Sequence, residues 1–121
     1  MSESQSLGEK GENLAAEYLK KKGYVIRDRN WVSGKKELDI VAENKDFIVF
    51  VEVKTRSVNF QVHPRDAVTK EKQRSVIFAA EWYIRKYNIE KESRFDIITV
   101  IEREGTFDID HIENAFYPTL R

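Results

Sequence analysis

The stretch Lys36-Glu37-Leu38-Asp39-Ile40-Val41 is followed, after a polar break at residues 43–46, by Ile48-Val49-Phe50-Val51-Glu52-Val53-Lys54. Both runs are apolar and have the length of strands. Each also carries ionisable side chains, and burying a charge is costly unless the charge is paired or bound to a metal ion. The two runs therefore predict adjacent strands whose charges need a compensating partner.

The polar break predicts an antiparallel hairpin with a two-residue turn at Asn44-Lys45. This register places Asp39 opposite Phe50, so that Asp39 and Glu52 are diagonal neighbours on one face, with Cβ atoms roughly 7–8 Å apart. A register shifted by two residues instead places Asp39 directly opposite Glu52, and a shift of one separates them onto opposite faces. The period of two also puts Lys54 on the face of Glu52.

Two carboxylates held this close repel each other, which raises the pKa of at least one of them unless a cation lies between them. Mg²⁺ prefers oxygen ligands and is commonly held by one or two carboxylates together with phosphate oxygens. The predicted ligands for Mg²⁺ or Mn²⁺ are Asp39, Glu52 and the backbone carbonyl of Val53. Lys54 would orient an attacking water or stabilise charge on a phosphodiester. The alternative interpretation is a half-exposed strand face with a weak ion pair.

A helix is predicted from Leu7 to Lys22, with Gly23 as its stop signal. Glu12 lies beside the apolar face of this helix. Glu12 is interpreted either as a third catalytic acid directed at the metal ion or as an acid that stabilises the first turn through the helix dipole.

The other predicted elements are strands over 24–31, 94–101 and 106–112, a loop over 55–64, and a second helix from near 66 or 69 to 87. The order α-β-β-β-α-β-β predicts an α/β fold with a mixed central β-sheet flanked by helices. One domain is expected over 7–117, with residues 1–6 as a flexible N-terminus.

The composition narrows the class of protein. A hydrophobic fraction of 40% argues against intrinsic disorder, and the lack of cysteine excludes disulfides and thiolate zinc sites. No apolar run approaches the roughly 20 residues needed to span a bilayer, and the first residues lack the pattern of a signal peptide. We therefore expect a cytoplasmic protein without a membrane partner.

The 21 basic and 21 acidic residues cancel, but they are unevenly distributed. A net acidic segment over 37–53 holds the proposed metal site, and net basic segments over 20–36 and 54–94 bracket it. Such charges either bind nucleic-acid phosphates or solvate helix faces. Trp31 and Trp82 either stack on bases or pack at the edge of the core. The candidate contacts to nucleic acid are Lys35, Lys36, Arg56, Lys72 and Arg74.

Several separated motifs occur in order between residues 8 and 113. They are Gly11-Glu12, Ala15, Leu19, Gly23-Tyr24, Asn30-Trp31, Glu37-Leu38-Asp39-Ile40, Phe50-Val51-Glu52-Val53-Lys54-Thr55-Arg56, Lys72 and Arg94-Phe95-Asp96. With this combination the chain resembles the bacterial YraN-like proteins, a family grouped with the PD-(D/E)XK nuclease superfamily. Lys36 stands where that family usually has glycine.

The resemblance implies a restriction-endonuclease-like core in which Asp39, Glu52 and Lys54 occupy catalytic positions and Glu12 that of the additional helix acid of resolvase-like members. Analogy with resolvases favours structured or branched DNA as the substrate. The sequence is thus interpreted as a Mg²⁺-dependent endonuclease acting on DNA, with a homodimer as one possible assembly. A non-catalytic nucleic-acid-binding module and a structural or adaptor protein are the two alternatives.

Overall fold

The computed structural model describes residues 6–57 and 67–118 of the chain. The helices and strands, in chain order, are α1 (Leu7–Lys21), β1 (Val25–Ser33), β2 (Lys36–Glu43), β3 (Phe47–Ser57), α2 (Lys70–Lys86), β4 (Glu92–Arg103) and β5 (Thr106–Phe116). The predicted mixed α/β architecture is confirmed.

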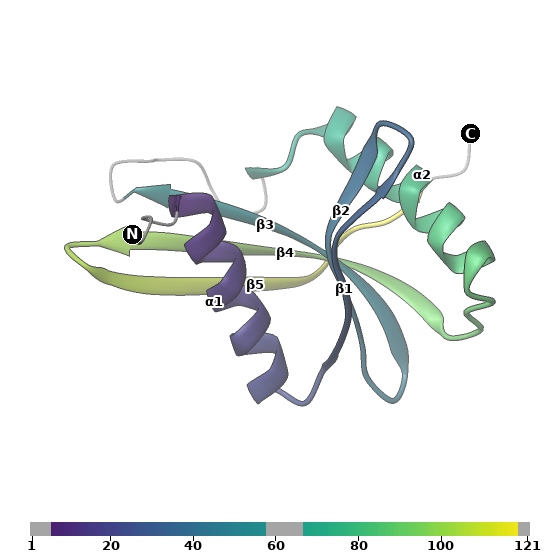
Figure 1. Ribbon diagram of the computed structural model, residues 1–121, viewed down its shortest axis with the longest axis horizontal. Coiled ribbons are helices and arrows are strands. Elements are labelled where there is room, and N and C mark those ends of the chain that lie inside the picture. Colours follow the sequence, from purple (N-terminus) through teal and green to yellow (C-terminus); the bar gives the residue numbers. More distant parts are fainter. Residues whose placement is uncertain (1–5, 58–66, 119–121) are drawn as a thin grey trace, which may run out of the picture.

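One five-stranded sheet joins the strands in the order β1-β2-β3-β4-β5. Neighbouring strands are antiparallel except for β3 and β4, which are parallel. A parallel pair needs a crossover connection, and α2 lies in that connection (Figure 1). The sheet is therefore mixed, and β3 is its middle strand.

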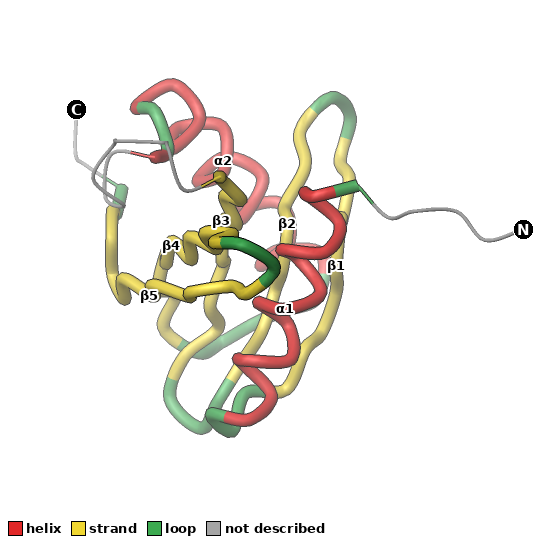
Figure 2. The backbone as a smooth tube through the Cα atoms, turned by 90° about the vertical axis from the view of Figure 1, so that its left-hand side faces the viewer, coloured by secondary structure: helices red, strands yellow, loops and turns green. Residues whose placement is uncertain are grey.

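The two helices cover opposite faces of the sheet (Figure 2). Successive side chains of a strand point to opposite faces, so that Val49 of β3 packs with Leu19 of α1, whereas Phe50 packs with Tyr83 of α2. The rings of Phe50 and Tyr83 are 5.8 Å apart between centroids. The first half of β3 is thus buried on both faces, as its unbroken apolar run indicates.

Capping side chains fix the start of both helices. Ser6 Oγ accepts a hydrogen bond from the Glu9 N–H at 3.1 Å, and the Glu9 carboxylate accepts one from the Ser6 N–H at 3.3 Å. Thr69 caps α2, so this helix begins at the later of the two predicted positions. Gly23, with a φ of 99°, follows α1 as predicted. Neither helix in the described ranges has the length and apolar character that crossing a membrane requires.

The β2–β3 hairpin turns one residue later than predicted, at Lys45-Asp46 rather than at Asn44-Lys45. Asn44 is the cause, because its Oδ1 accepts hydrogen bonds from the backbone N–H groups of Asp46 at 2.9 Å and Phe47 at 2.8 Å. The Asn44 N–H in turn donates to the Phe47 carbonyl at 3.1 Å. Asn44 therefore closes the turn instead of forming its tip.

Moving the turn by one residue shifts the strand register by two. Ile40 pairs with Val51, and the next position along this register sets Asp39 opposite Glu52. The predicted pairing of Asp39 with Phe50 is therefore wrong, and the alternative register is confirmed. The shift is an even number, so both carboxylates keep the common face that the sequence predicted.

The strands are longer than the sequence predicted, because pairing with neighbours extends them. β3 and β4 pair from Phe47 and Glu92 to Ser57 and Glu102, so residues 55–57 belong to β3 and not to the predicted loop. The rest of that loop, residues 58–64, and residues 1–5 of the predicted flexible N-terminus lie outside the described residues. Ser6 is the cap of α1.

Candidate functional site

Asp39 and Glu52 meet where the backbone pairing of β2 with β3 ends. The Asp39 carboxylate accepts a hydrogen bond from the Val53 N–H at 2.9 Å, and the Asp39 N–H donates to Glu52 Oε2 at 3.5 Å. At this point the two carboxylates thus accept the hydrogen bonds that backbone carbonyls accept elsewhere between the strands. In Figure 1 the β1–β2 hairpin turns away from the far halves of β3 and β4, which opens the edge of β3 beside the two acids.

Glu52 is a buried acid whose charge is only partly compensated. Its side chain is 1% exposed, and among the described residues Oε1 has no hydrogen-bond partner. In the described part of the chain Glu52 forms an ion pair with Lys72, whose Nζ lies 3.8 Å from Oε1. Burial, and then the nearby charge of Asp39, raise the pKa of Glu52 to about 8, against the opposing effect of Lys72. Glu52 therefore binds a proton at neutral pH unless another cation is present.

The oxygen atoms around this position suit a hard divalent cation. Burial also raises the pKa of Asp39, although the hydrogen bond from Val53 and the charge of Lys72 act in the opposite direction. In a strand the N–H and C=O of one residue point to the same side, so the Val53 carbonyl is directed toward Asp39 as its N–H is. In the described ranges no group of three or more His, Cys, Asp or Glu forms a metal centre. Mg²⁺ commonly uses only one or two carboxylates, so the pair and the carbonyl fit this ion.

A hollow of about 550 Å³ opens over the carboxylate pair, between the start of α1, the end of β3 and the start of α2. It collects most of the charged residues that the sequence analysis selected. Those that line it are Glu12, Asp39, Glu52, Lys54, Arg56 and Lys72, together with the backbone of Val53. The exposed acids Glu9 and Glu37 line it as well, so that acidic and basic side chains are combined in one concave site.

Glu12 lines the hollow but is bound to β1. Its Oε1 accepts hydrogen bonds from Arg29 Nη2 at 3.1 Å and from Asn30 Nδ2 at 2.9 Å. A close contact of α1 with β3 holds it there, because a Cβ on Gly11 would lie 1.9 Å from Thr55 Oγ1. The acid is thus positioned by a glycine contact and by an ion pair, and neither partner in β1 was predicted from the sequence.

The five predicted nucleic-acid contacts occupy three places. Arg56 and Lys72 line the hollow over the carboxylates. Lys36 and Arg74 line an adjoining hollow of about 810 Å³, which Lys72 lines as well. Lys35 is exposed in the turn between β1 and β2 and lines neither hollow. Lys72 thus connects the two hollows and also forms an ion pair with Glu52, a contact for which the sequence has no local signal.

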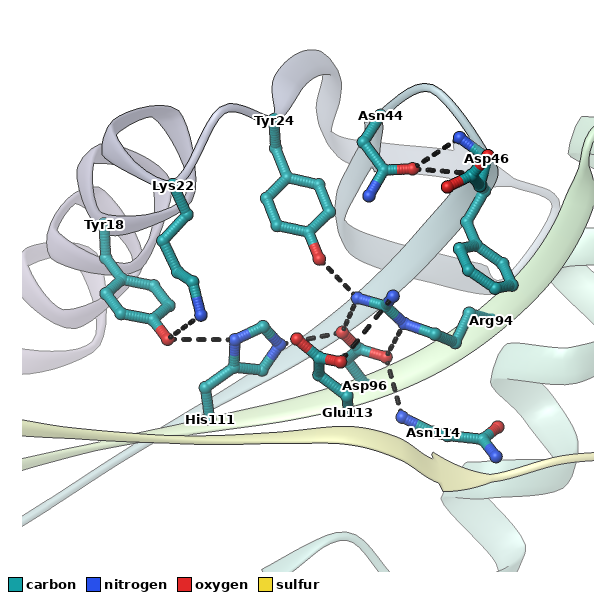
Figure 3. Close-up of polar contacts among 11 residues, drawn as sticks. Tyr18, Lys22, Tyr24, Asn44, Asp46, Arg94, Asp96, His111, Glu113 and Asn114 are labelled. Atoms are coloured by element: carbon teal, nitrogen blue, oxygen red, sulfur yellow. Dashed lines mark hydrogen bonds and ion pairs between the residues drawn. The ribbon is translucent and has the colours of Figure 1, made fainter.

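A second buried polar cluster lies between β4, β5 and α1 (Figure 3). Asp96, which is 0% exposed, accepts hydrogen bonds from Arg94 at 2.9 and 2.8 Å. His111 Nε2 lies 2.7 Å from the same carboxylate, and His111 Nδ1 lies 3.1 Å from the Tyr18 hydroxyl. Burial acts to raise the pKa of Asp96, but the hydrogen bonds of His111, Arg94 and the Asn114 N–H lower it. Asp96 does not line the hollow of Glu52, so this cluster joins elements rather than forming part of that site.

Comparison with known proteins finds similar chains in several bacteria. A family model described as "Uncharacterised protein family UPF0102" matches residues 11–100. A UPF0102 protein of Phocaeicola vulgatus is 48% identical over 120 residues, which is 99% of each chain. A UPF0102 protein of Bacteroides fragilis is 50% identical over the same share of both chains. A UPF0102 protein of Flavobacterium psychrophilum is 42% identical over 97% of this chain and 98% of its own.

Proposed function

The chain belongs to the uncharacterised protein family UPF0102, and from its carboxylate pair we propose that this member hydrolyses phosphodiester bonds in DNA as a Mg²⁺- or Mn²⁺-dependent endonuclease. The observation that carries the proposal is the buried Glu52 Oε1, which has no hydrogen-bond partner among the described residues and lies beside a second acid. Such a pair is costly to bury in the absence of a compensating cation.

The proposal includes membership of the PD-(D/E)XK superfamily. Two features of the fold support it: the acids lie on adjacent strands in the middle of a mixed sheet, and α2 forms the crossover that follows them. The predicted resemblance to a bacterial family is confirmed at the level of UPF0102. By analogy with resolvases we extend the proposal to structured or branched DNA as the substrate.

The carboxylates of Asp39 and Glu52 and the carbonyl of Val53 would hold the ion. When bound there, a divalent cation lowers the pKa of a coordinated water and neutralises charge on a phosphodiester. The protein contributes a rigid strand pair, which fixes the two acids relative to each other through the Val53 N–H bond. Since Glu52 otherwise binds a proton, the ion must compete with that proton at neutral pH.

The basic side chains of the hollow have separate roles. Lys54 follows Glu52 by two residues on the same face of β3 and would orient the attacking water or stabilise charge on the phosphate oxygens. Arg56 and Lys72, at the rim, would bind the phosphates on either side and so fix the strand in the site. Lys72 also keeps part of the Glu52 charge compensated before a substrate arrives.

A nucleic-acid-binding module without turnover is the second candidate. The observation that favours it is the engagement of Glu12 with Arg29 and Asn30, which leaves two acids rather than three for chemistry. Binding would then use the same basic rim, and the carboxylate pair would hold an ion that bridges protein and phosphate.

The test is a cleavage assay with linear, nicked, flapped and four-way DNA and with RNA, in Mg²⁺ or Mn²⁺. We expect cleavage by the wild-type chain and a loss of roughly 100-fold or more in Glu52→Gln, Asp39→Asn and Lys54→Ala, because these groups act mainly in the transition state. Glu90→Gln is the matched control. Glu90 is exposed beyond the C-terminal end of α2, and its substitution likewise replaces one carboxylate by an amide.

The outcomes separate the candidates. Equal cleavage by the wild type and the Glu52→Gln variant, purified side by side, would refute this site. A folded wild-type chain that cuts no substrate, yet binds DNA in a manner that depends on the divalent ion and on Asp39, would establish the binding module instead. If the wild-type chain neither binds nor cuts nucleic acid, with or without a divalent ion, only the structural or adaptor role remains.

A further inference from the structure

The outer face of α2 carries a row in which two aromatic side chains lie between two arginines. Arg74, Phe78, Trp82 and Arg85 follow one another at spacings of four, four and three residues, and therefore lie along one side of the helix. Phe78 is 50% and Trp82 is 48% exposed, and their ring centroids are 6.4 Å apart. Large aromatic side chains that remain exposed side by side commonly mark a binding surface.

Each of these two rings has a cation beside it. Lys36 Nζ lies 5.4 Å from the centroid of Phe78, and the Arg85 guanidinium carbon lies 5.8 Å from that of Trp82. Lys36 comes from β2, so the row is shared by two elements. Aromatic rings can stack on the flat bases of a nucleic-acid strand, and the adjacent cations can bind its anionic backbone.

The row begins next to the carboxylate site. Lys72 lines both the hollow over Asp39 and Glu52 and the adjoining hollow, whose wall includes Phe78. A third hollow of about 460 Å³ lies farther along α2 and is lined by Trp82 and Arg85. From Lys72 to Trp82 the helix advances about 15 Å, at about 1.5 Å per residue. Lys72 connects the first two hollows, and the ring contact of Phe78 with Trp82 connects the second to the third, so the three follow one path away from the two acids.

We propose that this path binds a single-stranded segment of nucleic acid, with unpaired bases stacked on Phe78 and Trp82 and phosphates beside Lys36, Arg74 and Arg85. The inference deepens the proposed nuclease function and depends on it for the role of the path, which is to lead a single-stranded arm or flap into the hollow of Asp39 and Glu52. The substrate class is thus DNA with an unpaired region next to the cut.

Charge and ring exposure together favour this occupant over a protein. Arg and aromatic side chains occur in both kinds of interface, but Lys is depleted in protein interfaces, and two of the four basic side chains on this surface are Lys36 and Lys86. The acids on the same helix surface are Glu71 and Glu81, so the basic side chains outnumber them. Duplex DNA keeps its base faces stacked inside the helix, and only an unpaired strand offers them to Phe78 and Trp82.

The test measures binding without cleavage, using the full chain with Glu52→Gln in the presence of a metal chelator. Fluorescence anisotropy is recorded with a labelled oligothymidylate and with a duplex of equal length. We expect Phe78→Ala with Trp82→Ala to weaken single-strand binding by roughly tenfold or more and duplex binding by less than about threefold, because only unpaired bases stack. Lys45→Ala, an exposed cation in the β2–β3 turn, is the control and should change neither affinity.

A second readout does not depend on truncating the rings. In a Trp31→Phe background Trp82 is the sole tryptophan, and its fluorescence should be quenched as oligothymidylate is added, while Trp82→Phe should keep most of the affinity. Unchanged single-strand affinity in the double variant, or no quenching at saturation, would overturn the inference. So would a wild-type dimer that the double variant converts to a monomer, since the face would then be an interface between copies. If the wild-type chain binds single strands but cleaves no substrate, the binding path is supported and only the nuclease function is refuted.

Discussion

Glu52 is the residue whose environment departs most from that of an ordinary surface acid. The period of two along β3 is a local property, so the sequence predicted that Glu52 shares a face with Lys54 and with Asp39. Its neighbour Lys72 could not be predicted in the same way, because Lys72 approaches from α2 on the other side of the crossover. The partner that tunes a buried charge is a property of packing rather than of local sequence.

We expect Glu52 to make the ion-free protein less stable as pH rises. Its folded pKa of about 8 lies above the ordinary value of 4.5, so its favourable contribution is complete below pH 4.5 and is lost as pH rises through about 8. Between these values the loss amounts to about 1.4 kcal/mol per pH unit. Thermal denaturation from pH 5 to pH 9 should show this slope in the wild type and a flatter profile in Glu52→Gln. Millimolar Mg²⁺ should restore stability at high pH. Near pH 7, where Glu52 is protonated, Mg²⁺ binding should release a proton, measurable by calorimetry in two buffers. Parallel profiles for the two chains would contradict the assignment.

Elements meet in this molecule through a few contacts that the sequence indicated only in part. The hairpin of β2 and β3 was predicted from its apolar runs, but its register depended on the Asn44 side chain closing the turn. Asn at that position is compatible with the tip of a turn and with its first residue, so the pattern alone left two registers open. The contact of α1 with β3 through Gly11 and Thr55 gave no sequence signal beyond the glycine itself.

Gly11→Ala should separate α1 from β3. The added Cβ would lie 1.9 Å from Thr55 Oγ1, so the helix must move, and overpacking of this kind costs about 1–3 kcal/mol. Glu12 moves with the helix, and the Arg29 ion pair should weaken. Gly8→Ala is the matched control, because its Cβ would meet only Ser6 Oγ at 4.0 Å. Urea denaturation should show a loss in the first variant, a neutral or small stabilising effect in the second, and partial rescue of Gly11→Ala by Thr55→Ala. A Gly11→Ala chain as stable as the wild type would exclude this contact as a constraint.

At the scale of the whole molecule, the order of helices and strands could be predicted and their long-range contacts could not. Caps, turns and apolar periods are local, and they fixed the order α-β-β-β-α-β-β. The parallel pairing of β3 with β4 and the cluster of Asp96 with Tyr18 and His111 join residues far apart in the chain. The apolar strand around Asp96 is compatible with a structural ion pair, as with Arg94, but its contacts with β5 and α1 through His111 have no local signal in the sequence.

Asp96 should make the protein less stable as pH falls, whereas Glu52 makes it less stable as pH rises. Its folded pKa is lower than the ordinary 3.8, so its contribution is complete above that value and is lost as pH falls through the lower folded value. Asp96→Asn leaves the Arg94 guanidinium buried without its carboxylate, and we expect a loss of about 3–5 kcal/mol at pH 7. Urea denaturation at pH 7 and pH 3 should show a large difference between the two chains at pH 7 and a smaller one at pH 3. Asp108→Asn, which removes an exposed ion pair with Arg103, is the control and should cost less than about 1 kcal/mol. Equal losses in the two variants would refute the structural role of the cluster.

The hydrogen bond from the Val53 N–H to the Asp39 carboxylate makes one backbone amide a spectroscopic reporter of the site. The bond is charge-assisted only while Asp39 is ionised, so the amide proton resonance of Val53 should move when the carboxylate gains a proton or shares its charge with a metal ion. Titration with acid and titration with Mg²⁺ would therefore be followed at the same nitrogen, and Asp39→Asn would abolish both responses. Metal occupancy, which a cleavage assay reports only through a product, would be visible in the resting protein with no substrate added.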